Sequence, residues 1–323
     1  MQDAAEPASA DHDLTIIGVG LLHRAHLTLE AQALVRAARV VMFSAYNAQI
    51  KDDLRGLNPR AEFLMQEQDE YEIGMFRPQM YQRIAEAVAG QAQQAPGVVS
   101  LHPGSAVVVD SITQALVRLC HERSLSLRII PGVSAVEAVL TQVHYDVADG
   151  VQIILAQKLI LHTKKLNPQL AAVIIQPGYY DTLYFAGAAH SKRHRFDRLQ
   201  QTLCNAYGEN HPACLTISPM HDEAQPTCFW FRLQNLSQLS SFIGPFHTLF
   251  IPPSEDAENN PQFEQRINSW PLLTEHIHCD RDGTPRQQSP GNWFNPRIAA
   301  VEQSLITEST ELAQAWDRKS HGH

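Results

Sequence analysis

One stretch of the chain combines residue types that can take a proton and stabilise a negative charge. Tyr71 is followed six residues later by Arg77, and Tyr81 follows four residues after that. The spacing of four places Arg77 and Tyr81 on one helix face, at a predicted helix over Pro78 to Ala89. A tyrosine, with an ordinary pKa of about 10, accepts a proton at neutral pH only where a cation favours its phenolate. Arg77 is permanently charged and can be that cation. Taken alone, each tyrosine could equally be a buried aromatic with a satisfied hydroxyl.

Three loops contain small residues that let a ligand approach the backbone closely. The first glycine loop is Gly18-Val19-Gly20, the second is His102-Pro103-Gly104-Ser105, and the third is Pro131-Gly132-Val133-Ser134. In open α/β sheets, ligands bind beyond the carboxyl ends of the strands, where these loops are expected. The first loop is not a dinucleotide-binding fingerprint, because His23 occupies the position of its third glycine. Alone it would be a tight turn, but the three loops in this order predict a ligand site.

Alternating strands and helices must position these loops. In the first half, strands are predicted over 14–17, 40–43, 97–101 and 127–130, and helices over 28–38, 78–89, 111–122 and from residue 135. In the second half, strands are predicted over 152–156, 171–176, 213–218, 227–233 and 247–251, and helices over 196–207 and 235–242. This alternation indicates α/β domains, the first with a mostly parallel sheet.

The predicted domain organisation has four parts. They are a flexible N-terminus (1–13), a first domain (14–150), a second domain (151–253) and a C-terminal extension (254–323). The extension is rich in turn residues, yet it contains Trp270, Trp293 and Trp316. Disordered linkers are poor in aromatic residues, so we expect the extension to dock on the body of the protein or on a partner subunit.

Composition excludes several classes of protein. The 34 acidic and 25 basic residues give a net charge of −9, which argues against nucleic acid as a partner. The five cysteines form no CxxC pair and the sixteen histidines form no HExxH motif, so neither a disulfide framework nor a metal site is expected. No segment resembles a signal peptide or approaches the about 20 apolar residues of a membrane span. We expect a cytoplasmic protein that does not bind membranes.

The order of the three glycine loops resembles that of the tetrapyrrole methylase superfamily. The resemblance covers roughly residues 14–253, and Pro131-Gly132-Val133-Ser134-Ala135 is its most specific motif. It implies a two-domain α/β fold with a mostly parallel first sheet and a mixed second sheet. It also implies S-adenosylmethionine as the cofactor, held by the three loops between the domains.

The segment from Tyr71 to Tyr81 resembles the catalytic segment of the borosin peptide-backbone N-methyltransferases. Further likenesses lie at 198–208, His211-Pro212, Pro219-Met220-His221 and 248–253. The resemblance implies methylation of backbone amide nitrogens in a ribosomally made precursor peptide. In that reaction Tyr71 would accept or relay the amide proton, Arg77 would stabilise the phenolate or the imidate oxygen, and Tyr81 would position the amide.

The resemblance also implies a set of cofactor-binding residues. These are Gly18, Gly20, Ser100, His102, Gly104, Ser134, Gln176 and Met220. The chain departs from the family at Ser100-Leu101, where the family has Tyr-Gly, so one aromatic contact to the cofactor is lost or replaced. Each of these residues alone is more often a packing residue than a ligand contact.

The expected partners are a precursor peptide and a second copy of the chain. The end of the chain, from Ala313 to Ser320, is polar, whereas a fused borosin substrate is hydrophobic, so the peptide is expected on a separate chain. The fold implies a homodimer. Two alternatives stay open: a methylase of a tetrapyrrole, a diphthine precursor or an RNA ribose, and a non-catalytic peptide-binding subunit. Tyr71, Arg77 and Tyr81 favour the peptide methylase.

Overall fold

The computed structural model describes residues 12–43, 48–66, 74–185, 195–217, 227–244 and 246–254. The chain divides into one compact unit, Met1–Asp256, and a second unit, Ala257–His323. All described residues belong to the first unit. Tyr71, Met220 and the predicted extension beyond Ser254 lie outside the described residues, so what the sequence indicates for them stays a prediction.

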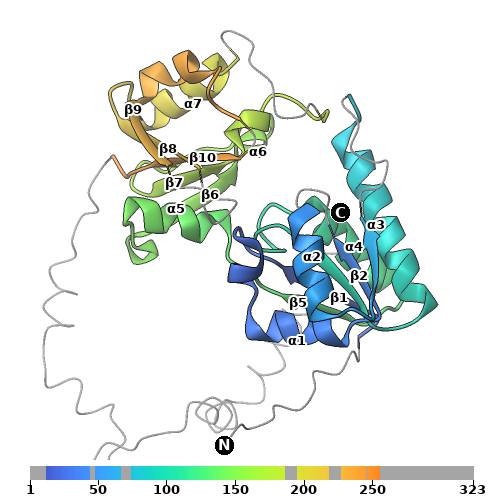
Figure 1. The fold of residues 1–323 in the computed structure, drawn as a ribbon. Helices are drawn as coiled ribbons and strands as arrows, with labels where there is room; N and C mark the ends of the chain where they lie inside the picture. Colours follow the sequence, from blue (N-terminus) through green and yellow to red (C-terminus); the bar gives the residue numbers. More distant parts are fainter. Residues whose placement is uncertain are drawn as a thin grey trace, which may run out of the picture. The chain divides into compact units, whose positions relative to one another are not determined.

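A parallel sheet forms the core of the first half of the chain (Figure 1). Within the described residues it has five strands in the order β3-β2-β4-β1-β5, and all neighbouring pairs are parallel. The strands are β1 (Leu14–Gly18), β2 (Val40–Phe43), β3 (Glu62–Met65), β4 (Val98–His102) and β5 (Leu127–Ile130). The helices are η1 (His23–His26, 3-10), α1 (Leu29–Ala37), α2 (Ala48–Leu57), α3 (Arg77–Gln94), α4 (Ser111–Glu122) and α5 (Ala135–Val143). The predicted parallel first sheet is confirmed.

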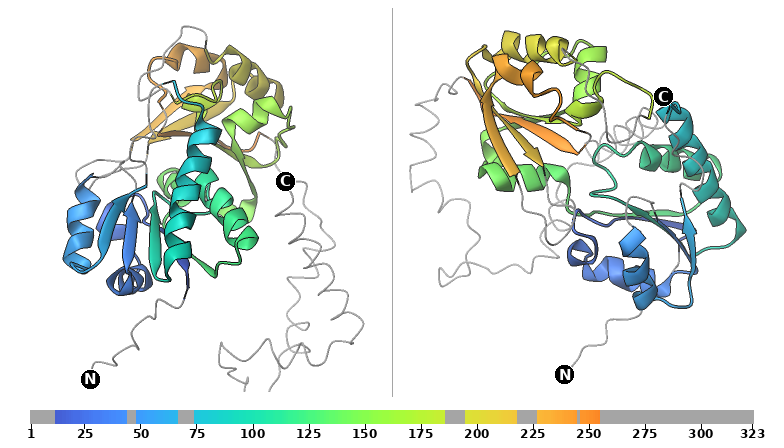
Figure 2. Two further views of the ribbon diagram at one scale, coloured as in Figure 1. Left: turned by 90° about the vertical axis from the view of Figure 1, so that its right-hand side faces the viewer. Right: turned by 45° about the horizontal axis from the view of Figure 1, so that its top comes forward.

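The central strands β2, β4 and β1 are buried along their whole length, as is typical of parallel sheets that helices cover on both faces. Their side chains alternate between two layers. Leu14 and Ile16 of β1 pack with α3 and α4, whereas Ile17 packs with α1 and α2. Figure 2 shows α3 and α4 side by side. The short apolar runs of the sequence are therefore strands whose two faces are both buried.

The three glycine loops follow neighbouring strands at one edge of this sheet. β4, β1 and β5 are adjacent, and Gly18 at the end of β1 pairs with His102 at the end of β4. Ile17 pairs with Ile130, the last residue of β5. Because parallel strands end at the same edge, the first loop lies between the second and the third. The three glycine loops, which are far apart in the sequence, therefore lie close together in the fold.

A mixed sheet forms the core of the second half. In the described part of the chain its order is β6-β7-β10-β8-β9, with β6 and β7 parallel and the other pairs antiparallel. Its strands are β6 (Val151–Leu155), β7 (Ala171–Ile175), β8 (Pro212–Ile217), β9 (Thr227–Arg232) and β10 (His247–Ile251). The helical segments are η3 (Val147–Asp149, 3-10), α6 (Ala156–Leu161), η4 (Pro177–Tyr179, 3-10), α7 (Asp197–Tyr207) and η5 (Leu233–Leu239, 3-10). The predicted mixed second sheet is confirmed.

Helices cover both faces of the mixed sheet. Leu159 of α6, Leu199 of α7 and Leu236 of η5 pack on one face. Val139 of α5 packs on the other face, together with Phe250 of β10. The helix α5 precedes the predicted domain boundary at residue 150 but packs on the second sheet, and the boundary itself stays a prediction.

Six elements go beyond those that the sequence predicts, namely α2, β3, α6 and the short 3-10 segments η1, η3 and η4. The strand β3 has four residues and is half exposed at the edge of its sheet, so its apolar pattern is weak. The helix α6 follows β6 directly, so its first residue, Ala156, was assigned to the preceding strand. The predicted helix over Asn235 to Phe242 is instead the 3-10 segment η5, which ends at Leu239. Short elements are the ones that local patterns define least well.

Candidate active site

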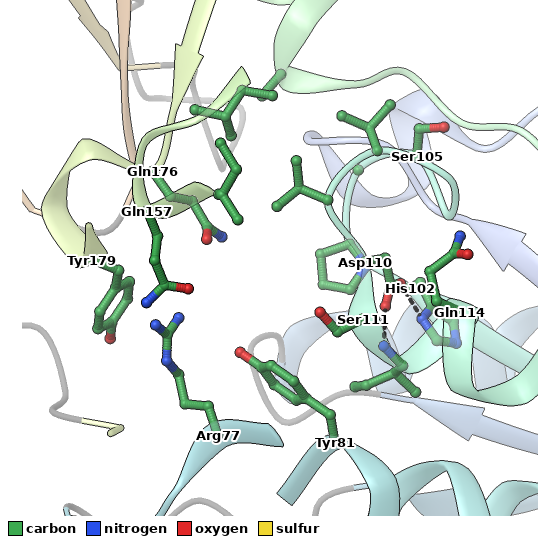
Figure 3. Close-up of a pocket in the computed structure, with 18 of the residues that line it drawn as sticks. Arg77, Tyr81, His102, Ser105, Asp110, Ser111, Gln114, Gln157, Gln176 and Tyr179 are labelled. Atoms are coloured by element: carbon green, nitrogen blue, oxygen red, sulfur yellow. Dashed lines mark hydrogen bonds and ion pairs between the residues drawn. The ribbon is translucent and has the colours of Figure 1, made fainter. Parts of the chain in front are cut away.

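A cavity of about 610 Å³ lies against the second and third glycine loops (Figure 3). Six residues expected at the site from the sequence line it, namely Arg77, Tyr81, His102, Gly104, Ser134 and Gln176. Gly18, Gly20 and Ser100 are not among the residues that line it. The fold thus gathers side chains from α3, from the end of β4, from the start of α5 and from the end of β7 around one space.

Gly18 and Gly20 shape the loops and do not form the cavity wall. A Cβ on Gly18 would lie 2.7 Å from the carbonyl oxygen of Gly104 and 2.8 Å from the amide nitrogen of Gly132. Gly20 has a φ of +73°, and a Cβ there would collide with the side chain of His26. The backbones of the three loops therefore pack against one another so closely that only glycine fits.

Gly104 is the glycine whose backbone faces the cavity. It exchanges two backbone hydrogen bonds with Gly20, each 2.9 Å long. Its φ is +70°, and among the described residues an added Cβ would meet only the side chain of Leu21, at 3.9 Å. Because the space in front of Gly104 is open, this is where a bound molecule can approach the loop backbone.

A chain of buried polar side chains supports the second loop. Gln66 Nε2 donates to Ser100 Oγ at 2.8 Å, and Ser100 Oγ lies 2.9 Å from His102 Nε2. His102 Nδ1 lies 2.5 Å from Asp110 Oδ2. A carboxylate only accepts hydrogen bonds, so His102 Nδ1 is the donor to Asp110. Both ring nitrogens of His102 therefore have partners inside the protein.

This polar chain accounts for the departure at position 100. Ser100 is fully buried, and its small hydroxyl links Gln66 to His102. An aromatic side chain at this position could not make both hydrogen bonds. Ser100 and His102, which the sequence indicated as cofactor contacts, thus hold the second loop in place from behind.

Asp110 ends the polar chain and also caps α4. Its Oδ1 accepts from the backbone amides of Ile112 and Thr113, at 2.9 and 3.0 Å. Burial by itself raises the pKa of Asp110, but the charge and hydrogen bond of His102 and the hydrogen bonds from Thr113 outweigh it, so the pKa lies below its ordinary value of 3.8. A carboxylate with a lowered pKa stabilises the fold above its unfolded pKa, and this contribution is lost as the pH falls through the folded pKa.

We expect Asp110→Ala to lower the free energy of unfolding by about 2–4 kcal/mol at neutral pH, from the loss of one helix cap and one charge-assisted hydrogen bond. Urea unfolding measures this difference, with the exposed Asp52→Ala as the control. The difference between the wild type and Asp110→Ala should shrink as the pH falls below the ordinary pKa of 3.8, because the carboxylate of the unfolded chain is protonated there while that of the folded protein is still ionised. If the difference in free energy of unfolding stays the same at acidic pH, Asp110 is not stabilised as a carboxylate by His102.

Arg77 begins α3, and its guanidinium is buried at the cavity with only 8% of the residue exposed. Its Nη2 donates to the carbonyl oxygen of Thr182 at 2.5 Å, and its Cζ lies 4.7 Å from the ring centroid of Tyr179. Among the described residues, Nε has no hydrogen-bond partner and no carboxylate pairs with the guanidinium. Among the described residues, a carbonyl dipole and an aromatic face are therefore what compensates the positive charge in the cavity wall.

A short backbone pairing fixes the start of α3. The amide of Arg77 donates to the carbonyl oxygen of Leu183 at 2.9 Å, and the amide of Phe185 donates to that of Met75 at 2.7 Å. A helix start leaves its first amides without partners in the helix, and no side chain caps this one. The pairing with residues 182–185 meets part of that need and anchors Arg77. The helix runs from Arg77 to Gln94, longer at both ends than the sequence indicates.

Tyr81 lies one turn after Arg77 on the same helix. Its ring is half buried against the core beside α3, and its hydroxyl points into the cavity (Figure 3). Gln176 lines the cavity from the side of the mixed sheet. It follows β7, which ends at Ile175, in a left-handed conformation with a φ of +51°. A guanidinium, a phenol and a side-chain amide therefore line one cavity.

A family model for tetrapyrrole (corrin/porphyrin) methylases matches residues 13–216. The chain belongs to the tetrapyrrole methylase family. Among curated relatives, this tetrapyrrole methylase is similar to the "methyltransferase/ribosomally synthesized cyclic peptide omphalotin A precursor" of Omphalotus olearius. The two are 22% identical over 94% of this chain and 71% of the relative. It is also similar to a "methyltransferase/ribosomally synthesized type I borosin cyclic peptide precursor" of Coprinopsis marcescibilis, with 24% identity over 95% of this chain and 77% of the relative.

Solved structures show the same fold. The tetrapyrrole methylase is similar to cobalt precorrin-4 methyltransferase, with a TM-score of 0.51, 15% identity, and coverage of 78% of this chain and 100% of the other. It is also similar to uroporphyrin-III-C-methyltransferase from Thermus thermophilus, with a TM-score of 0.52, 14% identity, and coverage of 75% and 92%. The family and the names of the relatives together support a methyltransferase.

Several residues at the site of this tetrapyrrole methylase were not predicted from the sequence. Tyr179, Gln157 and Asp110 line the cavity. Gln157 Nε2 donates to the carbonyl oxygen of Thr182 at 2.9 Å, the same atom that accepts from Arg77. A signal for Tyr179 was present, since Gln176-Pro177-Gly178 is another Gly/Pro turn directly after an apolar strand.

Two further findings concern metals and membranes. Within the described residues, no group of three or more His, Cys, Asp or Glu side chains could hold a metal ion. No helix in the described part of the chain is long and apolar enough to cross a membrane.

Proposed function

We propose that this tetrapyrrole methylase uses S-adenosylmethionine to methylate backbone amide nitrogens of a peptide. The observation that carries the proposal is Arg77, a buried cation at the cavity wall without a carboxylate partner among the described residues. A buried charge of this kind is costly to the folded state, so it calls for an anion that arises during function. A negative charge that develops on the substrate is such an anion.

Amide chemistry supplies that negative charge. An amide nitrogen is a poor nucleophile until it loses its proton, and the charge left by that proton resides largely on the carbonyl oxygen. A fixed cation in a site that excludes water stabilises such an oxygen without reorganisation. We assign this role to Arg77, whose guanidinium is already anchored by Thr182 and Tyr179.

The two tyrosines of the catalytic segment complete the assignment. Tyr81 presents its hydroxyl to the cavity one turn from Arg77, and we assign it the positioning of the amide (Figure 3). Tyr71 keeps the role of proton acceptor or relay that the resemblance implies. A tyrosine accepts a proton at neutral pH only where a cation favours its phenolate, and we assign that part to Arg77 as well.

The cavity and the residues around it suit S-adenosylmethionine. The cavity of about 610 Å³ falls in the range of small-molecule sites, and the open face of Gly104 leaves the loop backbone accessible. Gly104, Ser134 and Gln176 are the residues we assign to holding the cofactor. When bound, S-adenosylmethionine supplies an electrophilic methyl group. Gly18 and Gly20 support the loops from behind, and Met220 stays a predicted contact.

A peptide is the substrate that the site suits best. Leu183 and Phe246 line the cavity, with 39% and 43% of their surfaces exposed, and can pack against apolar side chains. The relatives from Omphalotus olearius and Coprinopsis marcescibilis are named as methyltransferases joined to a cyclic-peptide precursor.

We also propose that the protein is a homodimer. Light scattering on the purified protein measures its mass in solution and tests this proposal.

The test is a methyl-transfer assay with three acceptors. Purified protein is incubated with S-adenosylmethionine and with a pool of synthetic peptides rich in Val, Ile and Gly, with uroporphyrinogen III, or alone. We expect fragment-ion mass spectrometry to locate added methyl groups on backbone nitrogens of the peptides or of the protein itself. Methyl groups found only on the tetrapyrrole or on side chains, or no methyl group on the backbone of any peptide or of the protein itself, would overturn the proposal.

A further inference from the structure

Tyr179 and Arg77 form a contact that the catalytic segment does not include. Arg77 Cζ lies 4.7 Å from the ring centroid of Tyr179, within the range of a cation–π contact. Tyr179 is itself buried, with 7% of its surface exposed, and lines the cavity beside Gln157 (Figure 3). A desolvated guanidinium gains more from an aromatic face than an exposed one does.

The segment that carries Tyr179 is held firmly. Arg195 Nε lies 3.0 Å from Asp181 Oδ1, and Arg195 Nη2 donates to the carbonyl oxygen of Gly178. The hydroxyl of Tyr180 donates to the carbonyl oxygen of Arg195. These contacts tie both sides of Tyr179 to the start of α7, so the position of its ring is set by the fold of the second sheet.

We propose that Tyr179 is a positioning residue for Arg77. Its ring supports one face of the guanidinium while Thr182 accepts from Nη2, which leaves the rest of the guanidinium directed at the cavity. Burial raises the pKa of Tyr179, although the charge of Arg77 opposes this, so the phenol is neutral at physiological pH. The contact with Arg77 is therefore made by the aromatic face of an uncharged side chain. This inference rests on the proposed function for its catalytic consequence, but not for its geometry.

The first experiment measures the geometry without any substrate. Phenylglyoxal modifies accessible arginines, and peptide mapping follows Arg77 and the exposed Arg36 as an internal control. We expect Arg77 to react slowly in the wild type and in Tyr179→Phe, but at least about fivefold faster in Tyr179→Leu, which removes the aromatic face. Arg36 should react alike in all three. Equal reactivity of Arg77 in the Leu variant and the wild type overturns the proposal, whatever the protein catalyses.

The second experiment is a double-mutant cycle on methyl transfer to the peptide pool. Tyr179→Leu is expected to lower kcat about tenfold with little change in KM, and Tyr179→Phe to recover most of the loss. In an Arg77→Leu background, Tyr179→Leu should have little further effect, because it acts through Arg77. Additive losses, or a Phe variant as slow as the Leu variant, overturn the positioning role. A wild type that shows the expected Arg77 reactivity but methylates no peptide overturns the proposed function alone.

Discussion

Arg77→Leu is expected to slow methyl transfer by about 10²–10³-fold, the usual effect of removing a group that stabilises a developing oxyanion. The variant should bind S-adenosylmethionine with wild-type affinity, because the residues that we assign to the cofactor lie on other elements. Single-turnover transfer and isothermal titration measure the two quantities. Arg83→Leu, on the exposed side of the same helix, is the matched control and should leave both near the wild-type values.

We expect Arg77→Leu, which lowers activity, to raise the thermal stability of the protein. The guanidinium of Arg77 is buried, and among the described residues only Thr182 and Tyr179 partner it. Replacing a poorly compensated buried charge with an apolar side chain of similar reach often stabilises a protein. We expect the Tm of Arg77→Leu to rise by about 2–4 °C, the shift that about 1 kcal/mol gives in a protein of this size class. Wild-type turnover together with a lowered Tm would mean that Arg77 is a structural residue.

Gly104→Val is expected to weaken binding of S-adenosylmethionine by about 10²-fold or more, because it places a branched side chain where a ligand meets the loop backbone. The φ of Gly104 is +70°, so the substitution also strains the loop. Isothermal titration measures the affinity, and thermal unfolding measures the strain.

Gly208→Val separates these two effects. Gly208 also has a positive φ, +99°, with no described atom near an added Cβ, and it ends α7 away from the residues that line the cavity. Both variants should be destabilised, but only Gly104→Val should lose affinity. If Gly104→Val binds the cofactor like the wild type, the cofactor does not approach the second glycine loop.

The sequence by itself determined every described strand except β3, most of the helices and the order of the glycine loops. Strands such as β1 and β2 are short apolar runs whose two faces are both buried, and this pattern is local. The N-cap of α1 was equally local: Thr28 accepts from the amide of Ala31 at 3.0 Å. The spacing of Arg77 and Tyr81 predicted a shared helix face because a helix repeats every 3.6 residues or so.

Only the tertiary structure decided how each candidate site residue is placed. Gly18 and Gly104 are the same residue type in similar loops, but one is packed against backbone and the other faces the cavity. His102 lines the cavity, but both of its ring nitrogens have partners inside the protein, Ser100 and Asp110. These differences depend on which distant segments pack together. The residue types and spacing within one segment do not predict such contacts.

The partners of Arg77 show the same limit most clearly. Thr182 and Tyr179 lie about a hundred residues further along the chain and belong to the turns after β7 of the mixed sheet. A contact of this kind forms because two sheets bring the end of one strand beside the start of a distant helix. The sequence identified Arg77 as a candidate cation. Its burial and its contact with the ring of Tyr179 arise only from packing.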